Sequence, residues 1–230
     1  MAAVIAGCGS ATGSALARRF AKQGLKVYGG RRRPPSGVPE PSEFSLAAVD
    51  FRDEGAVQDF VASIEEPIEV AVHNIGGNVR FPVCETTPRV YRKVWEMCAL
   101  SAFHFSRAVA PGMVERGRGT LLFTGATASL RGGAGFCAFA GAMAAKRQLA
   151  QSLAREIGPA GVHVAHVVVD GGIDTTYVRQ LLGEDAYADL KARDGLLDPD
   201  AIADAYWAIH EQKRTAWTHE LDLRPYRETF

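Results

Sequence analysis

The sequence has few cysteines, and the ones that it has do not pair in any recognisable pattern. Its 230 residues include only Cys8, Cys84, Cys98 and Cys137, with no Cys-x-x-Cys pair and no nearby histidine cluster. This spacing predicts buried free thiols and excludes a disulfide framework or a zinc site. No apolar run approaches the roughly 18 residues of a membrane span, and the start lacks the basic n-region of a signal peptide. We expect a soluble, cytoplasmic protein.

An excess of charge of either sign is also missing. Lys and Arg number 26, Asp and Glu number 26, and the formal net charge is zero. A chain without a basic field is not expected to bind nucleic acid or an anionic membrane, which leaves a small-molecule substrate as the expected partner. No repeat is present, and the arginine- and proline-rich stretch at 31–41 is too short for a domain linker. We therefore expect one domain over residues 1–230, which is long enough to bury its own core.

Short apolar runs alternate with amphipathic stretches along the whole chain. Several runs are continuous, which is typical of strands buried on both faces. We expect strands at residues 3–6, 25–29, 46–49, 68–72, 120–124, 162–169 and 216–221. We expect helices at 13–23, 55–64, 88–113, 136–157 and 199–210, with Asp53, Thr87 and Asp198 as N-caps. This alternation predicts an α/β fold with a three-layer, doubly wound, Rossmann-type parallel sheet.

A glycine-rich turn links the first expected strand to the first expected helix. It reads Gly-Cys-Gly-Ser-Ala-Thr-Gly over residues 7–13. Small residues let the backbone approach a diphosphate, and the helix N-terminus offers free N–H groups and a positive dipole end. The alternative is a glycine-rich corner without a ligand. The residues expected to contact a dinucleotide here are Gly7, Gly9, Ser10, Ala11, Thr12 and Gly13.

Basic residues follow the second expected strand, where an acidic residue would instead select the unphosphorylated ribose. Arg31 and Arg32 offer planar guanidinium groups to a 2′-phosphate, and Ser10 could add a hydroxyl donor. This pattern favours NADP(H) over NAD(H). Arg33 is equally compatible with a solvated loop.

Two further strand ends contribute candidates for the adenosine side. Asp50, next to Phe51, could accept a hydrogen bond from the adenine amino group, or cap a helix. The segment His73-Asn74-Ile75-Gly76-Gly77 permits another close approach of the backbone to a ligand, or forms only a tight strand exit.

Taken in order, these motifs resemble the short-chain dehydrogenase/reductase family nearly end to end. Further matches are the long helix around 95–105, the segment 123–129 before the helix 136–157, and the segment 170–175. The resemblance implies the strand order 3-2-1-4-5-6-7, an NAD(P) cofactor, and a homodimer or homotetramer built on the two long helices. It also implies cofactor contacts from Asn74, Ile75, Gly76, Gly171, Ile173 and Thr175.

The catalytic residues of that family are absent. Its asparagine, serine, tyrosine and lysine fall on Cys98, Ala126, Phe139 and Met143. Lys146 lies seven residues, or two helical turns, beyond Phe139, so we do not expect it to take the place of the missing lysine. Residues 118–174 contain no tyrosine.

Other groups must then handle the proton that accompanies a hydride. Thr127 and Ser129 follow the fifth strand, where an unactivated hydroxyl is better suited to orienting a substrate. Asp170 ends the sixth strand and could donate a proton if partly desolvated, or cap a turn. Tyr177 could swing inward or lie on the surface, and His163 and His166 are expected in the core or an interface.

The leading hypothesis is an NADP(H)-dependent oxidoreductase with a non-standard proton relay, acting on a small or apolar carbonyl or alcohol. Phe139 and Met143 predict an apolar pocket if they face the cleft, and core packing if they do not. Two alternatives stay open. One is a non-catalytic NADP(H)-binding protein, and the other is a non-redox isomerase, dehydratase or lyase.

Overall fold

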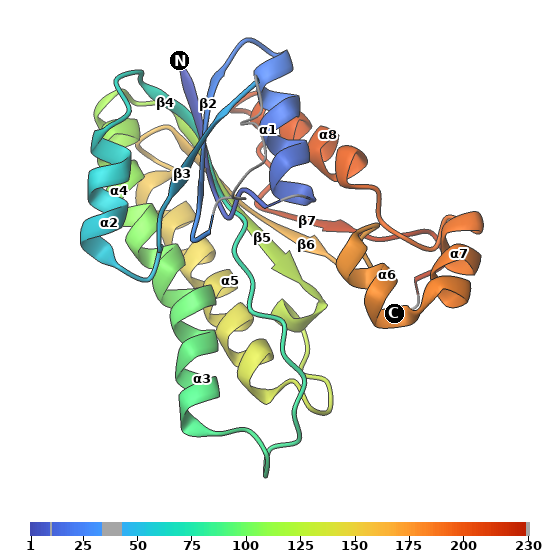
Figure 1. Cartoon of the computed structure of the whole chain (residues 1–230). Coiled ribbons are helices and arrows are strands. Elements are labelled where there is room, and N and C mark those ends of the chain that lie inside the picture. Colours follow the sequence, from blue (N-terminus) through green and yellow to red (C-terminus); the bar gives the residue numbers. More distant parts are fainter. Residues whose placement is uncertain (10, 34–42, 229–230) are drawn as a thin grey trace.

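Parallel strands form one seven-stranded sheet in the computed structural model, which describes residues 1–9, 11–33 and 43–228 (Figure 1). The strand order is β3-β2-β1-β4-β5-β6-β7, and every neighbouring pair is parallel. This confirms the predicted fold class and strand order. The strands are β1 Ala2–Ala6, β2 Lys26–Arg31, β3 Ser45–Ala48, β4 Ile68–His73, β5 Gly119–Ala126, β6 Val162–Val169 and β7 Glu220–Leu223.

Helices cover both faces of the sheet, so the fold has three layers (Figure 1). α1 (Thr12–Lys22) and α8 (Pro199–His210) pack on one face. α2 (Glu54–Ala62), α4 (Ser101–Glu115) and α5 (Cys137–Ile157) pack on the other face. The remaining helices are α3 Pro88–Trp95, the π-helix η1 Glu96–Leu100, the 3-10 turn η2 Thr127–Ser129, α6 Thr176–Leu182 and α7 Glu184–Ala192.

The sheet separates two apolar cores. Leu16 and Phe20 of α1 pack with Tyr206 of α8 on one side, and all three side chains are fully buried. Phe105 of α4 and Phe123 of β5 are the large buried rings on the other side. Every residue of β1 and β6 is buried, which is why neither sequence alternates regularly between apolar and polar residues. β1 is entirely apolar, and β6 is apolar except for His163 and His166.

Three predicted helix starts are confirmed by their capping hydrogen bonds. The Asp53 carboxylate accepts from the amide of Ala56 at 3.1 Å, and the Thr87 hydroxyl accepts from the amide of Val90 at 3.2 Å. Asp198 accepts from the amide two residues later at 2.9 Å. Each bond satisfies a first-turn N–H that has no partner within its helix.

The last strand is not where the sequence predicts it. The expected strand 216–221 is wrong, because β7 runs over Glu220–Leu223. The side chain of Gln212 accepts from the amide of Thr218 at 2.7 Å and donates to its hydroxyl at 2.8 Å, which holds this segment in a turn. Trp217 stacks on His163 with ring centroids 4.7 Å apart instead of joining the sheet.

The expected helix 88–113 is also interrupted. Its backbone widens into the π-helix η1 before continuing as α4, and this bulge buries Cys98. Two helices, α6 and α7, were not predicted. Neither has a buried residue, so neither carries the apolar periodicity from which a helix is predicted. In Figure 1 they stand out to one side of the sheet. None of the described helices is long and apolar enough to cross a membrane.

Candidate functional site

The glycine-rich loop between β1 and α1 is packed so closely that side chains are excluded from it. Gly7 has φ +85°, and a Cβ there would lie 2.7 Å from the carbonyl oxygen of Asn74. A Cβ on Gly13 would lie 2.5 Å from the carbonyl oxygen of Gly7. Gly9 and Gly76 differ, because an added Cβ at either position meets nothing within 4 Å. These two glycines face open space, which suits the close approach of a ligand to the backbone.

The first helix begins at this loop without a side-chain cap. No side-chain cap therefore competes with an anion at this helix end, although the Ser14 amide already donates to the Gly9 carbonyl at 2.9 Å, and the helix dipole adds positive potential there. Asn74 connects the loop to the exit of β4, because its side-chain amide donates to the Gly7 carbonyl at 3.2 Å. Its backbone amide donates to Ala6 at 2.8 Å.

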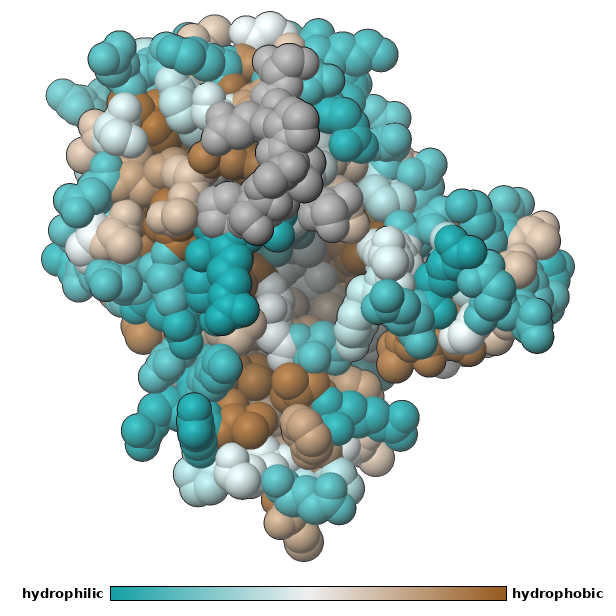
Figure 2. Space-filling view, in the orientation of Figure 1, coloured by the Kyte–Doolittle hydropathy of each residue, from teal (hydrophilic) through white to brown (hydrophobic). Residues whose placement is uncertain are grey.

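Two hollows meet at this loop and form one cleft along the carboxyl edge of the sheet. The smaller has a volume of about 230 Å³ and the larger about 1120 Å³, and both are lined by Gly7, Gly9, Asn74 and Gly76. Figure 2 shows the surface hollowed between the body of the molecule and the lobe formed by α6 and α7. Parallel sheets of this kind bind ligands at such an edge, where the strand order reverses.

The structure brings the predicted cofactor residues together along this cleft. The smaller hollow is lined by Gly7, Gly9, Arg31, Arg32, Asp50, Phe51, Asn74, Ile75 and Gly76. The larger adds Ala11, Thr12, Gly13, Gly171, Ile173 and Thr175. Ser10 lies outside the described residues.

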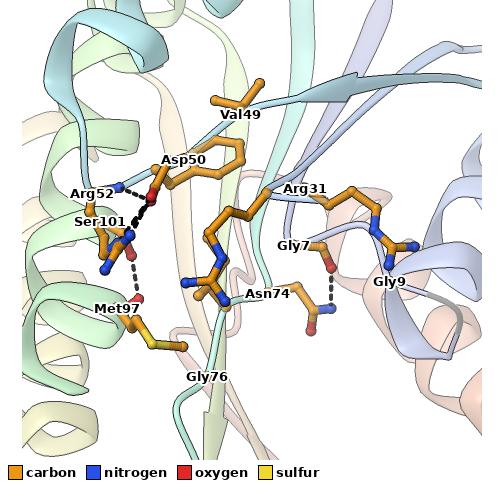
Figure 3. A pocket seen from close by; sticks show the side chains of 13 residues that line it. Gly7, Gly9, Arg31, Val49, Asp50, Arg52, Asn74, Gly76, Met97 and Ser101 are labelled. Atoms are coloured by element: carbon orange, nitrogen blue, oxygen red, sulfur yellow. Dashed lines mark hydrogen bonds and ion pairs between the residues drawn. The ribbon is translucent and has the colours of Figure 1, made fainter. Parts of the chain in front are cut away.

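Asp50 is already bound by a neighbour that the sequence analysis did not single out (Figure 3). Its carboxylate accepts from Arg52 Nε at 2.9 Å and 3.2 Å and from the Arg52 amide at 3.1 Å. The hydrogen bonds from Arg52 hold the pKa of Asp50 below its usual value. An adenine amino group would therefore have to donate to a carboxylate that already accepts hydrogen bonds from Arg52. The helix-cap alternative falls to Asp53 instead.

Apolar side chains fill the part of the fold where the family resemblance places tyrosine and lysine. Phe139 is 7% exposed and Met143 is 2% exposed, and they pack with Val94, Cys98 and Ala142. They belong to a packed cluster, as the core alternative predicts. Ala126 at the end of β5 packs against the same cluster.

Two of the predicted catalytic residues meet at the ends of β5 and β6. The Thr127 hydroxyl donates to one oxygen of the Asp170 carboxylate. The other oxygen pairs with Arg224 Nη2 at 3.2 Å. Asp170 is 2% exposed, whereas Thr127 is only half-buried. The result is a half-buried hydroxyl bonded to a buried carboxylate that pairs with an arginine. Neither Thr127 nor Asp170 is among the residues that line the two hollows, although Gly171 lines the larger one.

Arg224 could not be found from the sequence. It follows β7, and the pairing of β6 with β7 is what places it beside Asp170. Asp170 donates its own amide to the Leu223 carbonyl at 2.8 Å, which fixes the two strand ends together.

The other candidates for proton transfer, Ser129 and Tyr177, are less well placed to exchange a proton with a substrate. Ser129 is buried, and its hydroxyl accepts from the amide of Ala126 at 3.1 Å, so it stabilises the turn after β5. Tyr177 lies on α6 with 58% of its surface exposed, at the side of the larger hollow. The described residues hold no group of three or more His, Cys, Asp or Glu side chains that could bind a metal.

A buried basic cluster lies between α5 and the sheet. Lys146 is fully buried, and its Nζ donates to the carbonyls of Ile75 at 2.7 Å and Thr124 at 3.0 Å. Burial lowers the pKa of Lys146 to about 8. From the sequence, Lys146 was considered only as a replacement for the missing lysine beside Phe139. Its buried position against the sheet was therefore not predicted.

Two histidines belong to the same cluster. His73 Nε2 lies 2.9 Å from the Ser101 hydroxyl, which donates its hydrogen to the Met97 carbonyl, so His73 is the donor to Ser101. Burial and the charge of Lys146 hold the pKa of His73 well below its usual value. His166 Nδ1 lies 3.1 Å from Glu220, and burial lowers the pKa of His166 to about 4. Both imidazoles are therefore neutral at pH 7.

Comparison with known proteins gives a consistent result. A family model described as short chain dehydrogenase matches residues 1–186. The chain is similar to NADP-dependent 3-hydroxy acid dehydrogenase YdfG of Escherichia coli (strain K12), with 24% identity over 241 residues, covering 100% of this chain and 97% of that protein. It is also similar to a protein of Xanthobacter autotrophicus named inactive 2-(S)-hydroxypropyl-CoM dehydrogenase 2, with 30% identity, covering 77% of this chain and 80% of that one. A crystal structure of a short-chain dehydrogenase from Rhodopseudomonas palustris has 38% identity and a TM-score of 0.81, covering 97% of this chain and 99% of that chain.

Proposed function

Because this chain belongs to the short-chain dehydrogenase family, we propose that it is an NADP(H)-dependent oxidoreductase whose proton is handled by Thr127 and Asp170. The observation that carries this proposal is the hydrogen-bonded series Thr127–Asp170–Arg224 at the carboxyl ends of β5 and β6. The substrate that we propose is a small or apolar carbonyl compound or the corresponding alcohol. Assembly as a homodimer or homotetramer stays a prediction.

The cleft fits a dinucleotide on three counts. Gly9 and Gly76 leave open space beside the backbone, and the first turn of α1 has no side-chain cap that would compete with a diphosphate. Arg31 and Arg32 line the smaller hollow, where they would hold a 2′-phosphate. This supports NADP(H) over NAD(H), as does the similar YdfG protein, whose name includes NADP dependence.

Bound NADP(H) would supply or accept a hydride, which leaves one proton for the protein to move. In the direction of alcohol oxidation, the substrate hydroxyl would give its proton to Thr127 Oγ1 as Thr127 passes its own proton to Asp170. Carbonyl reduction would run the same transfers in reverse. Arg224 Nη2 lies 3.2 Å from the Asp170 carboxylate, which is 2% exposed, and so places a positive charge beside it. A positioned group of this kind contributes about 10²–10⁴-fold to a rate.

The proposed substrate class rests on the walls of the larger hollow. Val178, Leu181 and Leu182 of α6 contribute apolar side chains to it. In Figure 2 hydrophobic colouring also gathers below the hollow. Charged residues such as Asp174 and Arg179 line other parts of this hollow, so the α6 wall is the part that favours the apolar portion of a ligand.

The test combines nucleotide binding with turnover. NADPH fluorescence would measure binding, and loss of its absorbance would be followed with aldehydes, ketones, quinones and imines. Asp170→Asn and Thr127→Val should each lower kcat by about 10²–10⁴-fold while the Kd for NADPH stays within about threefold, because neither change removes a group that holds the nucleotide.

Asp222→Asn is the matched control, since Asp222 pairs with the same arginine but is more exposed. It should leave kcat near the wild-type value. A wild-type kcat in both Asp170→Asn and Thr127→Val would contradict the proposed relay.

A second candidate function is a non-catalytic NADP(H)-binding protein. The packed apolar cluster around Phe139 and Met143 favours it, because this cluster occupies the place of the usual proton donor. One similar protein also has the word inactive in its name. NADPH binding without turnover on any compound of the panel would support this candidate.

A further inference from the structure

Lys146 binds the sheet at the point where two central strands separate. The ladder between β4 and β5 ends at the pair His73 and Phe123. Beyond it, β5 continues beside β6 as far as Ala126, while the chain after β4 turns toward the glycine-rich loop. Ile75 and Thr124 therefore lie on opposite sides of the widening gap. Lys146 Nζ donates to the carbonyl oxygens of both residues, at 2.7 Å and 3.0 Å.

This ammonium has no carboxylate to balance its charge. Among the described residues, Lys146 forms no ion pair, although the chain has ion pairs elsewhere. The titratable groups that act on it or feel its charge are Cys98 from η1, His73 from β4 and His166 from β6. Burial raises the pKa of Cys98 and lowers the pKa of both histidines, so all three are neutral at pH 7.

In the part of the chain that the structure describes, no carboxylate pairs with the positive charge of Lys146, and Glu220, which lies 3.1 Å from His166, is already paired with Arg147 at 2.6 Å. Ile75, whose carbonyl Lys146 binds, lines the hollow on the adenosine side. Thr124, its other partner, lies in β5 two residues before Ala126, the position that the family resemblance assigns to the serine beside the nicotinamide. A buried charge acts over longer distances than an exposed one, because little water screens it.

We propose that Lys146 is a positioning residue of the cofactor cleft, which sets the spacing between Ile75 and Thr124 and favours binding of reduced over oxidised cofactor. The oxidised nicotinamide ring carries a positive charge and the reduced ring is neutral, so a nearby fixed cation disfavours only the oxidised form. This inference rests on the proposed function, because it requires that NADP(H) binds.

The test compares the dissociation constants of NADPH and NADP⁺ by titration calorimetry from pH 7 to pH 9.5. The 2′-phosphate is common to both nucleotides, so its effects cancel in the ratio of the two constants. In the wild-type protein the preference for NADPH should fall by roughly tenfold as Lys146 loses its proton across this range. A ratio that does not change with pH would overturn the inference.

Variants separate charge from hydrogen bonding. Lys146→Gln keeps a side-chain donor without the charge, and Lys146→Met removes both. Both should show the reduced, pH-independent preference, and Lys146→Met should also bind both nucleotides more weakly because two carbonyls lose their donor. Lys213→Met, which changes an exposed lysine, should behave as the wild type.

The outcomes distinguish this inference from the proposed function. If neither nucleotide binds the wild-type protein, the proposed function fails. If both bind with a ratio that responds to neither pH nor substitution, only the role of Lys146 fails. The pH series uses the wild-type protein, so it remains decisive even if a Lys146 variant does not fold.

Discussion

The two halves of the cleft differ in how closely they follow the family pattern. On the adenosine side, formed around β1, β2 and β4, the glycine-rich loop, the two arginines and the Asn74 segment lie where a dinucleotide-binding fold needs them. On the side formed by β5, β6 and α5, Ala126, Phe139 and Met143 hold the positions that the family resemblance assigns to the usual polar residues.

This difference shows that nucleotide binding and proton transfer place separate demands on the chain. The adenosine side depends on two charges and on backbone geometry, since a Cβ at Gly7 or Gly13 would meet the backbone within 3 Å. The other side needs only a few side chains at the right positions, and these can be supplied by different residues. Here Thr127, Asp170 and Arg224 form a polar series a short way from the packed cluster.

The largest expected effect comes from restoring the usual residues. Phe139→Tyr combined with Met143→Lys should raise the rate of simple carbonyl reduction by about 10²–10⁴-fold, measured as NADPH oxidation. Because both positions are buried, each new polar group should also lower the free energy of unfolding by about 1–3 kcal/mol, measured with denaturant. Phe139→Tyr alone is the control, because it adds the acid without its lysine. A folded double variant that binds NADPH but reacts at the wild-type rate would show that this side lacks more than two side chains.

The next effect concerns stability on the side that holds the buried lysine. The pKa of Lys146 falls from 10.5 in the unfolded chain to about 8 in the folded protein because of burial. Between these values the unfolded state binds more protons, so the lysine's contribution to the free energy of unfolding rises as pH increases. The difference in unfolding free energy between wild type and Lys146→Met should therefore shift in favour of the wild type by on the order of 3 kcal/mol from pH 8 to pH 10.5. An unchanged difference would mean that Lys146 is neutral throughout, or retains its usual pKa.

The smallest effect tests the adenosine side. Arg31→Ala together with Arg32→Ala should weaken NADPH by about tenfold or more, which corresponds to the loss of one charge-assisted hydrogen bond of about 1.5 kcal/mol. NADH should be nearly unaffected, because it lacks the 2′-phosphate. Arg33→Ala is the matched control, since this exposed arginine does not line the smaller hollow. Equal weakening of NADPH and NADH by the double substitution would rule out the 2′-phosphate assignment.

The fold could be predicted from the sequence where burial determines which types of residue occur. β6 was predicted with its observed bounds because all eight of its residues are buried and six of them are apolar. α8 was predicted because Asp198 caps it and its apolar residues repeat with helical spacing. β7 was misplaced because Trp217 stacks on His163. The sequence alone does not show whether such an aromatic residue is covered by stacking or by its place in a strand.

The candidate site was predictable in its local parts and not in its long-range pairs. Thr127 and Asp170 were predicted as candidates because each lies just past a strand, and parallel strands end at one edge of a sheet. Arg224 and the carbonyl partners of Lys146 were missed, because such contacts depend on register and helix position rather than on spacing along the chain. Arg52 is different, since it lies two residues from Asp50 and a search for local ion pairs would have found it.

The place of Arg224 after β7 makes the proposed relay depend on the docking of the last strand. The proposed nucleotide-binding residues come mainly from β1, β2 and β4 and the turns that follow them, whereas the arginine that pairs with Asp170 lies just after β7. A chain clipped by a protease before Arg224 would keep most of the proposed nucleotide-binding residues and lose the partner of Asp170. We therefore expect such a chain to lose turnover before it loses cofactor binding.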